Sequence, residues 1–256
     1  MLGARILLRV SRDRDAPDFP GGTQRTSGEE AALSFVVKTV PGFMEIIQSN
    51  VVLDFGCGGG WQSVAMAKRG AARVTGLDIR DLQPAAEQAR RSGCADRTSF
   101  TNHLPFEAMG TFDVVVSCSS FEHFSDAAGA LDLMRWAARP GGIVVITFAE
   151  PWYSPHGSHM NFFAKIPWVN LLFSERSVME VRSRFRFDGA RRYEDVEGGL
   201  NRMTLRKFER IIRSSGMRTE FLKYYPVKGL PGVDKLPIVR ELLVGAVACI
   251  LRKPEE

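Results

Sequence analysis

A glycine-rich turn between an apolar segment and a helical pattern is the feature that most constrains the fold of this chain. The apolar run 50–53 predicts a buried parallel strand, and it ends at Asp54. The sequence Gly56-Cys57-Gly58-Gly59-Gly60 follows, and a helical pattern then covers 61–68. A strand, a glycine turn and a helix in this order form a βα unit, in which backbone amides approach a ligand closely.

The spacing of the glycines argues against two nucleotide-binding motifs. The dinucleotide pattern G-x-G-x-x-G needs a third glycine where this chain has Trp61, and no Gly-Lys-Ser/Thr follows as in a phosphate-binding P-loop. Asp54 stands two positions before the first glycine, where it would repel a pyrophosphate but suit a cationic ligand. S-adenosylmethionine carries an ammonium and a sulfonium and has no phosphate.

A second βα unit agrees with such a ligand. Residues 73–79 predict a strand with Asp78 at its carboxyl end, 22 positions after Gly56. At this distance a Rossmann-type sheet places a carboxylate on the ribose hydroxyls. A carboxylate can accept hydrogen bonds from both hydroxyls of one ribose.

Four segments in order carry a resemblance to a known family. They are VLDFGCGGG (52–60), GLDI (76–79), LPFEAMGTFDVVVSCSSFEHF (104–124) and RPGGIVVIT (139–147). The chain resembles class I S-adenosylmethionine-dependent methyltransferases of the methyltransferase type 11 kind. The resemblance implies methyl transfer, with S-adenosyl-L-homocysteine as the product.

The resemblance also implies a set of cofactor-binding residues. Asp54 would hold the methionine amine and Asp78 the ribose. Many relatives have an acidic residue shortly before Leu-Pro-Phe. Residues 100–103 have none, so Asn102 is the candidate for the adenine edge. The whole predicted set is Asp54, Gly56, Cys57, Gly58, Gly60, Asp78, Ile79, Asn102 and Ser117.

The rest of the chain alternates between strand and helix patterns, which predicts a parallel sheet with helices on both faces. Strands are expected at 50–54, 73–78, 97–101, 112–117, 142–148, 218–225 and 246–252, and helices at 29–48, 61–68, 82–91, 126–138 and 204–215. Ser27 and Glu30 form a capping-box pattern for the first helix. From the resemblance, the last two strands form an antiparallel hairpin at the edge of a Rossmann-like, doubly wound, mostly parallel seven-stranded sheet.

We expect a single domain with four parts. These are an N-terminal helical extension (1–48), a cofactor-binding core (49–149), a substrate-lid insertion (150–202) and a C-terminal helix with strands (203–256). The lid falls where doubly wound sheets bind ligands, over the carboxyl ends of the strands. Its apolar residues over 160–175 fit a packed core, an apolar substrate channel or a membrane-facing patch.

Three histidines are candidates for the base that removes a proton from the methyl acceptor. His123 follows the fourth strand at a position that the family places near the transfer site. It could also cap or orient the local structure. His156 and His159 open the lid. Their spacing could hold a metal, but no third ligand is evident nearby, so no metal is predicted.

Composition and charge indicate the class of protein, its compartment and the charge of its partners. The chain is 45% hydrophobic and 25% charged, as in soluble globular proteins. Its four cysteines form no C-x-x-C pair, which favours a reducing compartment. With no 18-residue apolar run and no signal-peptide pattern, a cytoplasmic location is expected. The net charge of +5 favours a solvated, arginine-rich surface, with an acidic acceptor or an anionic membrane surface as the alternatives.

The leading hypothesis is methylation of an oxygen, hydroxyl or carboxyl, on a saccharide, secondary metabolite or lipid-linked precursor. Nucleic-acid methylation is an alternative, but the sequence after the fourth strand is Ser-Ser-Phe-Glu rather than Asn/Asp-Pro-Pro-aromatic. No RNA-binding module is evident. A non-catalytic protein with the same fold is the other alternative.

Overall fold

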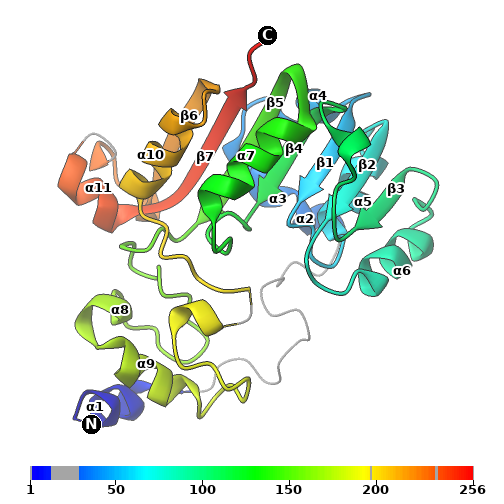
Figure 1. Cartoon of the computed structure of the whole chain (residues 1–256). Coiled ribbons are helices and arrows are strands. Elements are labelled where there is room, and N and C mark those ends of the chain that lie inside the picture. The colour runs from blue at the N-terminus through cyan, green and yellow to red at the C-terminus, as the bar shows by residue number, and fades with distance from the viewer. Residues whose placement is uncertain (1, 13–28, 197, 234–235, 256) are drawn as a thin grey trace.

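The chain folds around one seven-stranded sheet in a computed structural model that describes residues 2–12, 29–196, 198–233 and 236–255 (Figure 1). The strands are β1 (Val51–Phe55), β2 (Arg73–Leu77), β3 (Thr98–Thr101), β4 (Phe112–Cys118), β5 (Ala138–Ala149), β6 (Arg218–Pro226) and β7 (Val244–Arg252). Their order is β3-β2-β1-β4-β5-β7-β6. The first five strands are parallel, and β7 runs antiparallel to both β5 and β6. The predicted mostly parallel sheet with an antiparallel C-terminal hairpin is confirmed.

The order of the strands fixes where a ligand can bind. From β1 the chain steps outward to β2 and β3, and it then returns to the other side of β1 as β4. The carboxyl ends of β1 and β4 therefore diverge into different loops at this switch point. In doubly wound sheets a crevice opens at such a point.

Helices cover both faces of the sheet. The α-helices of the described residues are α1 (Leu2–Val10), α2 (Glu29–Ala32), α3 (Ser34–Thr39), α4 (Phe43–Ile47), α5 (Trp61–Lys68), α6 (Gln83–Arg91), α7 (Ala127–Ala137), α8 (Val169–Leu172), α9 (Glu175–Arg182), α10 (Leu205–Ser214) and α11 (Pro237–Leu243). One face packs against α7 and α10, and the other against α3, α4 and α5. Along β5, Ile146 and Phe148 face α7 and α10, whereas Val145 faces the opposite layer. This period-two alternation lets one strand serve both cores.

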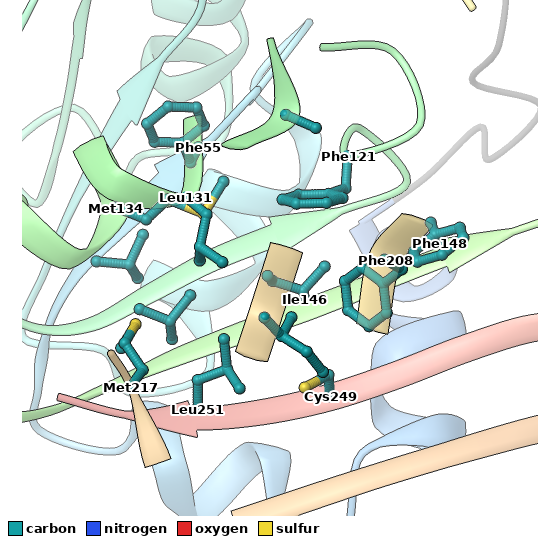
Figure 2. Close-up of a cluster of buried hydrophobic side chains, with 14 of the residues drawn as sticks. Phe55, Phe121, Leu131, Met134, Ile146, Phe148, Phe208, Met217, Cys249 and Leu251 are labelled. Carbon is teal, nitrogen blue, oxygen red and sulfur yellow. The ribbon is translucent and has the colours of Figure 1, made fainter. Parts of the chain in front are cut away.

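Aromatic side chains join the strand ends to α10 in the first of these cores (Figure 2). Phe121 and Phe148 lie 5.5 and 5.2 Å from Phe208, measured between ring centroids, in edge-to-face contacts. Phe121 belongs to the loop after β4, so this packing fixes the beginning of that loop. Offset and edge-to-face aromatic pairs add about 0.5–1.5 kcal/mol beyond the area that they bury.

The predicted helix over 29–48 is wrong as a single element. The structure has three short helices there, α2, α3 and α4. Pro41 disfavours helical dihedrals at Val40, which is extended, and Gly42 has a φ of +67°. The capping residue Ser27 lies outside the described residues. The fifth strand also begins earlier than predicted, at Ala138, with an irregular register against β4 between Phe112 and Val114.

The segment between β5 and α10 forms a small core of its own. It buries Met160, Phe163, Val169 and Val178. Much of the apolar stretch 160–175 is therefore packed core, which is the first of the three alternatives that the sequence left open. The sequence did not predict that α1 completes this core through Ala4 and Leu7. Figure 1 shows α1, α8 and α9 together at one end of the molecule. The four-part division of the chain stays a prediction.

Candidate active site

The glycine turn after β1 needs glycine at two positions, because each has both a positive φ angle and a close neighbour. Gly56, Gly58 and Gly60 all have positive φ angles, of +84°, +54° and +78°. A Cβ on Gly56 would lie 2.7 Å from the Ser120 side chain, and one on Gly60 would lie 2.8 Å from the Ala85 Cβ. The turn therefore passes tightly between the loop after β4 and α6, and its glycines leave no Cβ between the backbone and a bound ligand.

Asp54 is a fully buried carboxylate at the end of β1. Its Oδ2 accepts a hydrogen bond of 2.6 Å from Ser63 Oγ of α5, and its Oδ1 has no partner among the described residues. Burial raises the pKa of Asp54 to about 7, and the nearby Asp78 adds to this. A cation bound here would supply the missing partner and would favour the ionised form.

Asp78 connects the first two strands of the predicted site. Its Oδ2 accepts a hydrogen bond of 2.8 Å from the Gly58 amide, and its Oδ1 accepts one of 3.0 Å from the Arg80 amide. Oδ1 also accepts a hydrogen bond of 3.3 Å from Arg80 Nε, so Oδ2 is the oxygen that keeps a lone pair for a hydroxyl. The neighbouring Ile79 is 95% exposed, so it presents an apolar surface at the rim.

Asn102 holds the loop after β2 in place. Its Nδ2 donates to the carbonyl oxygens of Asp78 and Arg80, at 2.7 and 2.8 Å. Both amide hydrogens are thus used, which leaves only Oδ1 for an adenine edge. The adenine role of Asn102 stays a prediction.

Three residues near the turn, two of them buried, contribute backbone contacts and packing. The Cys57 amide donates to the Leu77 carbonyl at 3.1 Å, and burial raises the pKa of the Cys57 thiol, which keeps it neutral. Ser117 is fully buried near the end of β4, and its Oγ has no partner among the described residues. Ser120, which the sequence did not flag, donates to the carbonyls of Gly56 and Cys118 at 3.0 and 3.1 Å. Ser120 therefore ties the glycine turn to the loop after β4.

The fold brings two of the three candidate histidines together. The rings of His123 and His159 meet edge to face, with centroids 5.6 Å apart. His123 Nδ1 lies 2.6 Å from the Gly199 carbonyl oxygen, so this nitrogen carries the proton and Nε2 is left as a proton acceptor. Burial lowers the pKa of His123, and it lowers the pKa of His159 to about 4. Both rings are therefore neutral at pH 7.

His156 lies apart from this pair. Its Nδ1 is buried and makes no hydrogen bond to any described residue. Its carbonyl accepts from the His159 amide, so the two residues share a tight turn at the entrance of the lid. Within the described ranges, no group of three or more His, Cys, Asp and Glu side chains is placed to hold a metal ion.

Two glutamates, the buried Glu122 and the partly buried Glu150, belong to the same region and were missed from the sequence. Glu122 follows β4 and Glu150 follows β5, and with His159 and Arg202 they line a cavity of about 10 Å³. That is close to the room one water needs. Burial raises the pKa of Glu122 to about 8 and that of Glu150 to about 7. No periodicity in the sequence marks these residues, because only the parallel pairing of β4 and β5 brings their ends together.

Comparison with known proteins agrees with this geometry. Residues 53–146 match the family model described as "Methyltransferase domain". A "Ubiquinone biosynthesis O-methyltransferase" of Psychrobacter arcticus is 41% identical over 103 residues, which are 38% of this chain and 39% of that protein. A protein of the same name from Pseudomonas aeruginosa is 40% identical over 100 residues, 38% of this chain and 43% of that protein. The matched part spans about two fifths of these relatives.

Solved structures share the fold across most of the chain. An S-adenosylmethionine-dependent methyltransferase from Mesorhizobium loti aligns with a TM-score of 0.56 at 16% identity, covering 88% of this chain and 100% of that one. The [4+2]-cyclase SpnF aligns equally well, at 0.56 and 17% identity over 89% of this chain and 81% of that one. The chain thus has the fold of class I S-adenosylmethionine-dependent methyltransferases, and its matched segment is a methyltransferase domain. The predicted fold is confirmed, residues 53–146 match the predicted family, and S-adenosylmethionine is the cofactor that they imply.

Proposed function

We propose that this chain transfers a methyl group from S-adenosylmethionine to an oxygen of a small-molecule acceptor. The observation that supports the proposal is a cluster of buried and partly buried titratable side chains beside the glycine turn. His123, His159, Glu122 and Glu150 meet under the lid, at the carboxyl ends of β4 and β5. A group that takes a proton from an acceptor hydroxyl has to lie at this edge of the sheet.

The residues around the turn fit the cofactor. Asp54 Oδ1 is a buried oxygen without a described partner, which suits the methionine ammonium, directly or through water. Gly56, Gly58 and Gly60 have no side chains to fill the cradle, and Asp78 Oδ2 keeps a lone pair for the ribose. S-adenosylmethionine supplies the electrophilic methyl group. The chain's own residues position the acceptor and keep water away.

The histidine pair supplies the proton acceptor. His123 is neutral and has its Nδ1 proton tied to Gly199, so its Nε2 can take the hydroxyl proton. Glu150 has a pKa of about 7, so it can hold a proton near neutral pH without a large energetic cost. A carboxyl acceptor is already ionised and would need positioning only.

The acceptor class is a saccharide, a secondary metabolite or a lipid-linked precursor, and it is acidic or apolar in character. The relatives named for ubiquinone biosynthesis and for O-methylation favour an oxygen acceptor and make a lipid-linked one the first to test. The described part of the chain contains no helix suited to crossing a bilayer. Because a [4+2]-cyclase shares the fold, methyl transfer itself has to be measured.

The test is a screen of candidate acceptors with methyl-labelled S-adenosylmethionine, followed by alanine variants of the three histidines. We expect His123→Ala and His159→Ala to lower turnover on the order of a hundredfold or more while cofactor affinity is kept. His156→Ala tests the third candidate, and His103→Ala, at an exposed position, is the matched control. Full turnover in all three variants would exclude histidine base catalysis and leave positioning as the mechanism.

A further inference from the structure

Helix α1 has two distinct faces. Ala4 and Leu7 are buried in the lid core. On the opposite side, Leu2 is 76% exposed, Ile6 47% and Val10 about as much. Because these three residues are four positions apart, they form one apolar stripe along the helix. A helix that only completed the lid core would gain nothing from this stripe.

Basic side chains run beside the stripe. Arg5 and Arg9 are exposed and lie one turn apart, next to Leu2 and Ile6 on the helix surface. The segment 2–12 contains no acidic residue. Among the residues that the structure describes, no carboxylate forms an ion pair with Arg5 or Arg9. Their charges are therefore available to an anionic partner.

A helix at the same end of the molecule also exposes apolar side chains. Leu171 and Leu172 of α8 are exposed, Leu172 by 64%. Phe173, which follows α8 directly, approaches Gly3 so closely that a Cβ on Gly3 would lie 3.7 Å from its ring. Helices α1, α8 and α9 also lie together at one end of the molecule in Figure 1. We call Leu2, Arg5, Ile6, Arg9, Val10, Leu171 and Leu172 the α1–α8 surface.

We propose that the α1–α8 surface docks on an anionic lipid bilayer. An aliphatic stripe bordered by arginines is the pattern of helices that lie in the plane of a bilayer, with apolar side chains among the acyl chains and guanidinium groups at the headgroups. Glu180, exposed on α9, is the charge that opposes this attraction, and two arginines on α1 outweigh it. The inference goes beyond the proposed reaction, because it states where the protein works and holds for any acceptor.

The test is sedimentation of the full chain with vesicles of phosphatidylcholine, with and without phosphatidylglycerol. The protein is expected to bind the vesicles that contain phosphatidylglycerol and to lose that binding at high salt. Arg5→Gln with Arg9→Gln should lower the partition coefficient on the order of tenfold or more. Ile6→Ser with Leu172→Ser should lower it by a similar factor, because each apolar side chain loses its burial in the bilayer.

Met109→Ser is the matched control, since Met109 is 49% exposed but lies just before β4, at the amino edge of the sheet. It should bind vesicles like the unmodified protein, and thermal melting should show that every variant is folded. Equal sedimentation with both lipid compositions, or no sedimentation at all, would overturn the proposal. So would a dimer in analytical ultracentrifugation that Ile6→Ser with Leu172→Ser dissociates, because the surface would then join two copies of the chain.

Discussion

Replacement of Glu122 by glutamine should stabilise the protein at high pH. Glu122 is buried after β4, its Oε2 has no described partner, and its pKa is raised from 4.5 to about 8. The unfolded chain loses this proton near pH 4.5, whereas the folded chain keeps it until about pH 8. The free energy of unfolding therefore falls as the pH rises through this window.

The size of the effect follows from the two pKa values. One pKa unit is worth about 1.4 kcal/mol, so Glu122 destabilises the folded state by on the order of 3–5 kcal/mol at pH 8 and by almost nothing at pH 4.5. Glutamine keeps the shape and removes the charge. We expect the variant to match the unmodified protein at pH 5 and to be more stable by a few kcal/mol at pH 8.

Urea unfolding at several pH values measures this difference. Asp54 and Glu150 also have raised pKa values, so they too lower the free energy of unfolding as the pH rises. His159 has a lowered pKa and has the opposite effect, because it lowers the free energy of unfolding as the pH falls below about 6.5. The unmodified protein alone cannot separate these groups, but the difference between it and the variant isolates Glu122. Glu107→Gln, at an exposed position, is the control. If Glu122→Gln and Glu107→Gln show the same pH dependence as the unmodified protein, ionisation of Glu122 does not lower the free energy of unfolding at high pH.

Two further substitutions test the cofactor cradle. Asp78→Ala should weaken S-adenosylmethionine binding by about 1–3 kcal/mol in calorimetry, because the ribose hydroxyls and the Gly58 amide lose their acceptor. Asp81→Ala removes the same charge from an exposed position nearby, and equal losses in both variants would refute the ribose role. Gly60→Ala should destabilise the fold by roughly 2–4 kcal/mol in urea unfolding, since a clash with Ala85 adds to the strain of its positive φ. Gly189→Ala has similar strain without a clash, so it should cost only about 1 kcal/mol, and equal costs would remove the packing argument.

Local sequence patterns were sufficient to predict the strands. The runs at 50–54 and 73–78 became β1 and β2 within one residue at either end, because a buried parallel strand needs a continuous apolar run between turn residues. The predicted helix over 29–48 was wrong because the pattern spanned Pro41 and Gly42, whose backbone preferences end a helix. The apolar pattern was given more weight than Pro41 and Gly42, although these two residues already indicated a break in the helix.

The rest of the site depends on contacts between distant segments. The edge-to-face contact of His123 and His159 exists only because the lid returns over the loop after β4. Glu122 and Glu150 meet because the parallel pairing of β4 and β5 brings the ends of these strands together. In a similar way α1 joined the lid core across more than 140 residues of sequence, which no pattern within α1 could reveal. Motifs therefore mark the residues proposed for the cofactor, whereas tertiary packing brings together those proposed for the acceptor.

Calorimetric titration of the protein with S-adenosylmethionine, with NAD⁺ titrated in parallel, tests the central claim most directly. Asp54, the cradle from Gly56 to Gly60 and Asp78 predict one site for S-adenosylmethionine per chain at micromolar affinity. They also predict no binding of the dinucleotide, because Asp54 repels a pyrophosphate. The absence of a binding signal at high micromolar S-adenosylmethionine, or tighter binding of NAD⁺, would contradict the account.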